Sequence, residues 1–169
     1  MNRVIKINQL VNKIQLLKKQ NKKIGLCWGV FDLLHPGHVK HLEEAKKMCD
    51  VLVVGLTCDT EVQKRKGLAR PIFNEKLRAY SMSQLKIVDF VFINFDTNYV
   101  EAINQLRPNF CIKGEDYADV KRKKTNQSLE EKTVKKFGGH MVFTKTGPFA
   151  NIKTTKIIDH IKEANYENK

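Results

Sequence analysis

The chain has 169 residues, enough for one domain with a hydrophobic core and too few for a synthetase with an anticodon-binding module. Its formal charge of +13 and pI near 9.6 favour anionic partners, but do not choose among nucleic acid, anionic lipid and phosphorylated metabolites. The sequence has no signal-peptide core, no apolar run long enough to span a bilayer, and four cysteines without disulfide spacing. We therefore expect a cytoplasmic, soluble protein with free thiols and no membrane partner.

The first third of the chain predicts a helix followed by a strand, a helix and a strand. Apolar residues recur at helical spacing near the N-terminus: Ile7, Leu10, Val11, Ile14 and Leu17. We expect this leading helix, within residues 1–23, to pack on the domain, because its apolar residues are ordinary core types. Residues 24–28 predict a strand, a helix then runs to about residue 48, and residues 50–56 predict a strand buried on both faces. This order predicts a right-handed parallel crossover.

The rest of the chain continues the alternation. Residues 57–71 predict a polar, basic loop, and the helix that starts at Asn74 should turn Leu77, Met82 and Leu85 inward. The remaining elements are strand 88–93, helix 99–106, strand 110–113, helix 129–137, strand 140–144 and helix 154–164. We therefore expect an α/β fold, a single Rossmann-like doubly wound and mostly parallel sheet with helices on both faces, over residues 24–164. Residues 165–169 form a tail.

The turn after the first strand carries two histidines. It reads Gly29-Val30-Phe31-Asp32-Leu33-Leu34-His35-Pro36-Gly37-His38. The Pro-Gly pair would hold both imidazoles near the first turn of a helix, whose amides favour anions such as phosphate. The alternatives are an ordinary surface turn and half of a metal site. No paired ligand spacing among the other histidines and the cysteines supports a metal.

These ten residues resemble the G-x-F-D-x-x-H-x-G-H signature of the cytidylyltransferase-like nucleotidyltransferases. Such enzymes join a nucleoside triphosphate to a phosphorylated acceptor and release pyrophosphate. Over roughly residues 10 to 162 the chain is similar to bacterial heptose 1-phosphate adenylyltransferases, the nucleotidyl half of a bifunctional enzyme whose sugar kinase half is absent here. The matching segments are residues 67–71, 75–79, 88–91, 106–108 and 112–117. Glycerol-3-phosphate cytidylyltransferases share Gln63-Lys64, Lys66 and the spacing from Arg78 to Asp89.

Two positions depart from the family pattern. The second motif normally has a small residue before two threonines, whereas Lys153 precedes Thr154 and Thr155 here. Thr154 and Thr155 would cap the last helix and hold a pyrophosphate, and Lys153 would add charge at the leaving group. The alternative is an ordinary helix cap. Trp28 stands where a small polar residue is usual, and a simple role for it is to fill the core.

The resemblance implies roles for named residues, with positioned donors supplying most of the acceleration. The expected catalytic residues are His35, His38 and Lys153. The expected nucleotide-binding residues are Gly29, Val30, Phe31, Asp32, Lys113, Gly114, Asp116, Thr154 and Thr155. The expected substrate-binding residues are Lys64, Lys66 and Arg78. Asp32 either ligates Mg²⁺, the expected cofactor, or only fixes the turn. Lys64 has solvated surface as its alternative, and residues 113–116 have a tight glycine turn.

The resemblance also implies a function. We expect transfer of a nucleoside monophosphate, from ATP rather than CTP, to a sugar phosphate supplied by a separate sugar kinase. The first alternative is a CTP-dependent cytidylyltransferase acting on glycerol 3-phosphate or a similar alcohol phosphate. A more distant alternative is a non-enzymatic protein that binds nucleotides or nucleic acid, against which stands the lack of a recognition-module motif. A homodimer is compatible with each of these.

Overall fold

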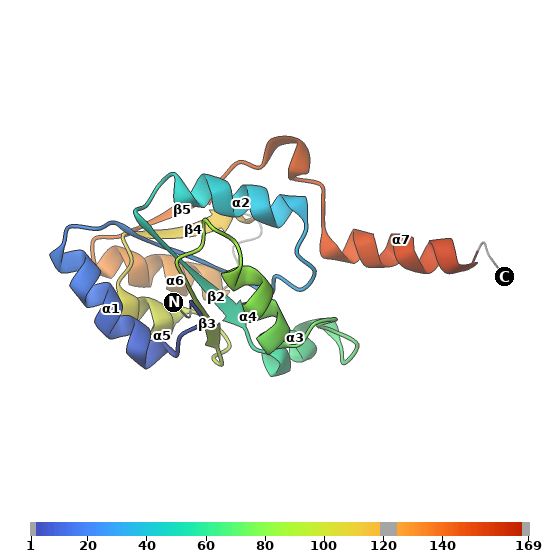
Figure 1. Cartoon of the computed structure of the whole chain (residues 1–169), viewed down its shortest axis with the longest axis horizontal. Helices are drawn as coiled ribbons and strands as arrows, with labels where there is room; N and C mark the ends of the chain where they lie inside the picture. Colours follow the sequence, from blue (N-terminus) through green and yellow to red (C-terminus); the bar gives the residue numbers. More distant parts are fainter. Residues whose placement is uncertain (1–2, 119–124, 167–169) are drawn as a thin grey trace.

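The computed structural model describes residues 3–118 and 125–166 (Figure 1). Within them, five parallel strands form a sheet in the order β3-β2-β1-β4-β5. The strands are β1 (Ile24–Gly29), β2 (Val51–Thr57), β3 (Phe90–Asn94), β4 (Phe110–Gly114) and β5 (His140–Thr144). The chain winds outward from β1 to β3, then returns to place β4 on the other side of β1. This reversal confirms the predicted doubly wound fold and creates a switch point at the carboxyl ends of β1 and β4.

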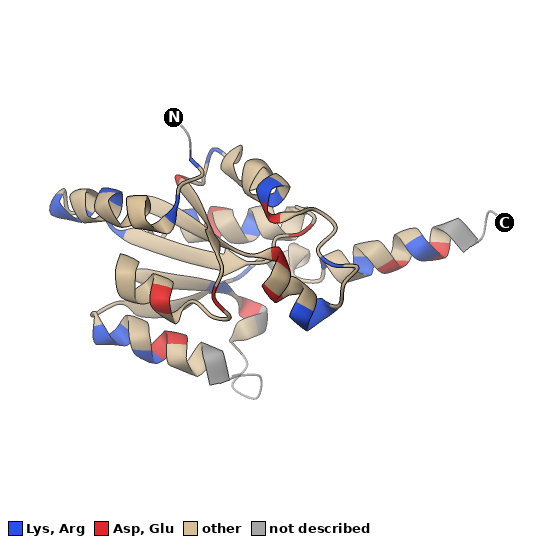
Figure 2. Ribbon diagram, turned by 90° about the horizontal axis from the view of Figure 1, so that it is seen from below, with Lys and Arg blue, Asp and Glu red and all other residues tan. Residues whose placement is uncertain are grey.

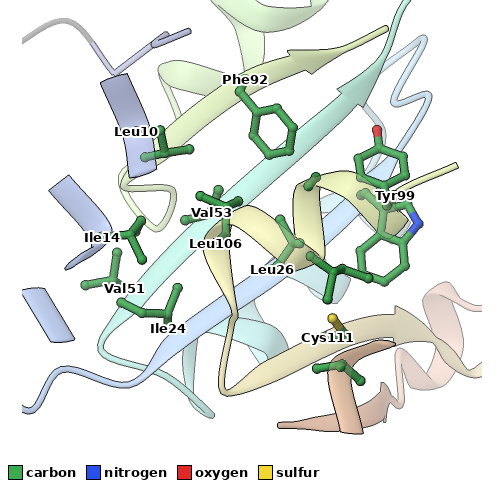
Figure 3. Close-up of a cluster of buried hydrophobic side chains, with 14 residues drawn as sticks. Leu10, Ile14, Ile24, Leu26, Val51, Val53, Phe92, Tyr99, Leu106 and Cys111 are labelled. Atoms are coloured by element: carbon green, nitrogen blue, oxygen red, sulfur yellow. The ribbon is translucent and has the colours of Figure 1, made fainter. Parts of the chain in front are cut away.

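Helices cover both faces of the sheet. One face packs against α1 (Ile7–Lys19), α5 (Val100–Leu106) and α6 (Thr125–Lys136), and is called the α5 face here. The other packs against α2 (Pro36–Lys46) and α4 (Glu75–Ser83), and is called the α2 face. Successive strand residues point to opposite faces, so Leu26 and Trp28 lie in the α5-face core and Cys27 lies in the α2-face core. Figure 3 shows the α5-face core, into which α1 inserts Leu10 and Ile14.

One helix was missed from the sequence. Residues 57–71 contain α3 (Asp59–Lys66) where a polar loop was predicted. The segment has almost no apolar residues, so no helical periodicity marks it. However, its first turn carries Asp59 and Glu61 and its last turn carries three basic residues, which complements the helix dipole. That order of charges is the signal that indicates the helix.

The bounds and orientation of other elements also differ from prediction. In α4, Leu77 is 51% exposed rather than buried, whereas the neighbouring Arg78 is 1% exposed. Polar contacts of Arg78, described below, turn this side of the helix inward. Helix α6 begins at Thr125, before the predicted start at residue 129. Its first turn lacks apolar residues, so no helical spacing marks it in the sequence. Strand β3 begins at Phe90 because the carboxylate of Asp89 accepts a hydrogen bond from the Leu52 amide just before the ladder.

The C-terminal helix, α7 (Thr154–Tyr166), extends away from the layered body, with the C-terminus at its far end (Figure 1). Two short 3-10 helices, η1 (Glu115–Tyr117) and η3 (Gly147–Phe149), follow β4 and β5. Among the described residues, no helix has the length and apolarity needed to cross a membrane. All four cysteines are free thiols, which confirms that prediction.

Candidate active site

The two histidines lie at the start of α2, directly beyond the end of β1. Pro36 takes the first helical position, where its missing N–H leaves no bond unmade, and His35 is the N-cap. His35 Nδ1 accepts a hydrogen bond from the His38 amide at 3.3 Å. The two rings stack with centroids 3.6 Å apart. Because Nδ1 of His35 is an acceptor, the neutral ring carries its proton on Nε2, which makes Nε2 a donor.

Burial keeps both imidazoles neutral at pH 7. Desolvation lowers the pKa of His35 and, together with the charges of His35 and His41, lowers the pKa of His38 to about 3. His38 Nδ1 is buried without a hydrogen-bond partner among the described residues. Phe31, which meets the His38 ring edge-on at 5.1 Å, has a φ of 47°, a strained conformation for an aromatic residue. Neutral, partly unpartnered rings in a strained turn are typical of a binding site.

The loop after β5 lies against this histidine turn. A Cβ on Gly37 would lie 3.0 Å from the Phe149 carbonyl oxygen in η3 and 3.1 Å from the His35 ring, so the absence of a side chain permits the approach. Glu115 fixes the same loop, because its carboxylate accepts hydrogen bonds from the Thr146 amide at 2.9 Å and the Thr146 hydroxyl at 3.1 Å. Segments more than a hundred residues apart thus meet at the switch point.

The second motif stands at the start of α7. The helix begins at Thr154, and the Ile157 amide donates to the Lys153 carbonyl oxygen at 3.1 Å. Lys153 therefore occupies the N-cap position, and Thr154 and Thr155 are the first two helical residues rather than the caps that were predicted. Amides of these positions have no partner within the helix, so they remain available to an anion.

Asp32 fixes a loop. Its side chain is 1% exposed and pairs with the Arg70 guanidinium, whose Nε and Nη2 both lie 2.8 Å from Oδ2. Its other oxygen accepts hydrogen bonds from the amides of Ile72 at 2.8 Å and Phe73 at 3.1 Å. No group of three or more His, Cys, Asp or Glu in the described parts of the chain is placed to hold a metal. Both carboxylate oxygens of Asp32 are engaged by the loop, and the role of Asp32 toward Mg²⁺ stays a prediction.

The predicted substrate-binding lysines lie on α3. Lys64 is exposed and pairs with Glu61 at 2.6 Å. Lys66 is exposed as well. Desolvation and the charge of Arg70 lower its pKa, and the charge of Asp32 raises it.

Arg78, also predicted to bind substrate, is an interior residue. Its guanidinium donates to three carbonyl oxygens, those of Phe73 at 3.0 Å, Val30 at 2.6 Å and Thr57 at 2.8 Å. It also forms an ion pair with Asp59 at 2.7 Å. These bonds join the turn after β1, the end of β2 and the start of α3. In this structure Arg78 positions the loops around the switch point, and its donors are directed at protein oxygens.

The residues predicted to bind nucleotide at the end of β4 do not all lie in one element. Lys113 and Gly114 end that strand, and Lys113 lies on the α5 face, across the sheet from the histidine turn. Asp116 belongs to η1, and its side chain lies outside the described residues. Glu130, a buried carboxylate in α6, was not predicted as a site residue, because nothing in the sequence distinguishes it from the surface acids around it. Arg70, predicted to join Lys64, Lys66 and Arg78 in a phosphate-binding cluster, pairs with Asp32 in the structure.

A family model described as cytidylyltransferase-like matches residues 26–160, which include the histidine turn and the start of α7. The chain belongs to the cytidylyltransferase-like family. This confirms the predicted relationship, and the protein is a nucleotidyltransferase. The matched residues contain most of β1, the strands β2 to β5 and every predicted site residue.

Curated relatives match the same part of the chain. It is 43% identical over 114 residues to bifunctional protein HldE of Campylobacter jejuni subsp. doylei, which covers 68% of this chain and 25% of that protein. It is 36% identical over 157 residues to bifunctional protein HldE of Desulfatibacillum aliphaticivorans, which covers 92% of this chain and 30% of that protein. The chain thus spans about a quarter of the length of these relatives.

Two solved structures share the fold. The lipopolysaccharide core biosynthesis protein from Thermoplasma volcanium superposes with a TM-score of 0.58 at 27% identity, covering 73% of this chain and 95% of that chain. The pantoate-beta-alanine ligase from Francisella tularensis, solved with a β,γ-ATP compound and β-alanine, gives a TM-score of 0.60 at 18% identity, covering 86% of this chain and 67% of that chain. The second likeness shows the fold alone.

Proposed function

We propose that the protein transfers a nucleoside monophosphate from a nucleoside triphosphate, with ATP favoured, to a sugar phosphate, and so makes a nucleotide-activated sugar. The observation that carries this proposal is the stacked pair of His35 and His38 at the N-terminus of α2, beyond the end of β1. Helix amides and adjacent imidazoles at a switch point favour a polyphosphate. The resemblance to heptose 1-phosphate adenylyltransferases supports a sugar 1-phosphate as the acceptor.

In the proposed reaction, an oxygen of the acceptor phosphate attacks the α-phosphorus. A bond forms between them, the bond from the α-phosphorus to the oxygen that bridges to the β-phosphorus breaks, and pyrophosphate leaves with the electron pair. His35 and His38 contact the α-phosphate and leaving-group oxygens, where negative charge grows. Lys153, Thr154 and Thr155 hold the far end of the triphosphate. Asp32 is committed to its loop, so a Mg²⁺ ion accompanying the triphosphate would be held by the phosphate oxygens and would neutralise part of their charge.

We also propose that the enzyme acts in the cytoplasm and receives its acceptor from another enzyme. Nucleoside triphosphate substrates and four free cysteines both suit the cytoplasm, which is kept reducing. A sugar kinase must supply the acceptor, because the attacking group is a phosphate ester. Lys64 and Lys66 are the proposed contacts for the acceptor phosphate or for the outer phosphates of the nucleotide.

Pyrophosphate release with a panel of triphosphates and phosphorylated acceptors tests the proposal. We expect release with ATP and a sugar 1-phosphate, and at least a ~10²-fold loss for His38→Ala, because positioned donors to growing charge are worth that much. His140→Ala, which removes an exposed histidine on β5, is the matched control and should keep full activity. The melting transition of His38→Ala should persist. If the transition and the activity were lost together, His38 would be a core residue instead.

The same panel decides between the nucleotides. Release with CTP and glycerol 3-phosphate, without release from ATP and sugar 1-phosphates, would replace this proposal with the cytidylyltransferase alternative. Triphosphate binding without release from any pair would indicate a non-enzymatic nucleotide-binding protein.

A further inference from the structure

Aromatic and charged side chains cluster on the α5 face at the carboxyl ends of β1 and β4. Trp28 stacks on Tyr99 with ring centroids 5.2 Å apart, and Figure 3 shows Tyr99 at this end of the core. The ammonium of Lys113 lies 4.1 Å from the Trp28 ring centroid and 4.7 Å from that of Tyr117. Glu130 of α6 is 4% exposed and accepts a hydrogen bond from the Tyr99 amide at 3.1 Å. The cluster lies across the sheet from the histidine turn.

The ammonium of Lys113 lacks a complete set of partners. The residue is only 9% exposed. Among the side chains and carbonyls that the structure describes, none accepts a hydrogen bond from this ammonium and no carboxylate forms an ion pair with it. The two ring faces attract the charge and exclude water from part of the ammonium, while its N–H donors remain accessible to water or to an anion. An anion would compensate the partly desolvated charge better than water does.

Charges around Lys113 act in both directions. Desolvation lowers its pKa to about 8, while the nearby groups Glu130, Cys27 and Cys111 raise it and Arg65 of α3 lowers it. Glu130 has a raised pKa of its own, chiefly because it is buried. The ligand-free amine is therefore partly deprotonated at pH 8. An anion beside it would raise the pKa and draw in a proton.

In-line displacement at phosphorus places the attacking and leaving oxygens on opposite sides of the phosphorus atom. The histidine turn and η3, which are proposed to hold the triphosphate, meet on the α2 face. An acceptor phosphate bound at the same strand ends, but on the α5 face, would attack the α-phosphorus from the side away from the departing pyrophosphate. We propose that the Lys113 ammonium binds the acceptor phosphate on the α5 face, with Trp28 and Tyr117 as walls and Glu130 as the positioning residue behind them. This inference rests on the proposed function and gives it a second anion site.

Sulfate titration at pH 8 tests the site without turnover. Sulfate imitates a phosphate dianion and does not titrate in this range, so a proton taken up on binding comes to the protein. The protein is first saturated with α,β-methylene ATP, or the CTP analogue if CTP is the substrate, which cannot release pyrophosphate. Calorimetry in two buffers of different ionisation enthalpy then gives sulfate affinity and proton uptake. The variants are Lys113→Met and, as the control, Lys135→Met, an exposed α6 lysine paired with Glu131 at 2.8 Å.

We expect the unmodified protein to take up about half a proton with sulfate at pH 8 and to bind sulfate more weakly as the pH rises toward 10. Lys113→Met should bind sulfate at least tenfold more weakly and lose the proton uptake, while its affinity for the nucleotide analogue stays within twofold. Lys135→Met should match the unmodified protein.

Three results would overturn the assignment. The first is unchanged sulfate affinity in Lys113→Met, and the second is an equal fall in its affinity for the nucleotide analogue, which would make Lys113 a nucleotide contact. The third is sulfate binding by the unmodified protein that does not weaken as the pH rises toward 10, which decides the question even if the variant does not fold. Failure of the proposed function is a separate observation, because it appears as absent pyrophosphate release while the sulfate site persists.

Discussion

Burial and local contacts determine what three cationic or titratable side chains can do: His38, Arg78 and Lys113. Their positions in the sequence alone do not indicate these roles. Burial holds His38 neutral beside a helix N-terminus, where a polyphosphate would meet it as a hydrogen-bonding group. Arg78 directs its donors at protein oxygens, whereas Lys113 has only aromatic faces among the described groups. The same positive charge therefore stabilises loops at one position and, as we propose, binds an anion at the other.

The contacts of Arg78 predict a loss of stability on substitution. Arg78→Met would leave the Asp59 carboxylate and three carbonyl oxygens without their donor, and removing one partner of a buried ion pair costs about 3 kcal/mol or more. Urea unfolding measures this change. Lys76→Met, on the exposed side of the same helix, is the control and should change the free energy of unfolding by less than about 0.5 kcal/mol. A stable Arg78→Met with only a raised KM for the acceptor would restore the binding role predicted from the sequence.

At the scale of elements, the site depends on three connections that hold their neighbours in place. Asp32 fixes the loop between α3 and α4, Arg78 ties both helices to the ends of β1 and β2, and Glu115 fixes the loop after β5. Each connection uses buried or half-buried polar groups with several hydrogen bonds, which hold one arrangement. The histidine turn is thus supported from both sequence halves.

The contact between α2 and η3 predicts the effect of a single methyl group. Gly37→Ala would press against the Phe149 carbonyl oxygen and the His35 ring, both about 3 Å from the new Cβ, and would move η3 away. A displacement of about 1 Å at a reacting centre costs about 10²-fold in rate, so kcat for pyrophosphate release should fall by that order. Gly67→Ala is unsuitable as a control because of its positive φ, whereas Ser81→Ala on α4 is suitable. A normal kcat in Gly37→Ala would show that η3 can shift to accommodate the methyl group without slowing the reaction.

At the scale of the molecule, the Lys and Arg residues that the structure describes are dispersed over several elements. Figure 2 shows them on helices around the body, including α7, while the basic run at residues 121–124 lies outside the described part of the chain. A dispersed charge attracts polyanions weakly from many directions and supplies no sequence readout. The excess charge therefore suits the capture of small phosphorylated substrates.

This dispersal predicts the behaviour of the protein with nucleic acid. Binding of a fluorescent oligonucleotide should weaken at least tenfold between about 50 and 200 mM salt, because it depends on counterion release alone. Affinity measured by anisotropy should also be the same for oligonucleotides of different sequence. Tight binding that resists salt and prefers one sequence would instead favour the nucleic-acid-binding alternative.

The sequence by itself determined the family, the parallel sheet and the position of the histidine turn. Those features depend on local patterns: the runs at 24–28 and 51–56 lack polar side chains, as strands buried on both faces require, and the turn is ten residues at fixed spacing. Helix α3 escaped detection because its formation depends on end charges and on neighbours rather than on an apolar stripe.

Only the tertiary structure decided which cations face inward and on which side of the sheet they lie. Arg78 is buried because Val30 and Thr57, at 48 and 21 residues' distance, offer it carbonyl oxygens at two strand ends. Lys113 lies opposite the histidine turn because strand pairing places it beside Trp28, whose side chain points to the α5 face. Such roles arise from contacts between distant segments, so the spacing of apolar residues along the sequence does not indicate them.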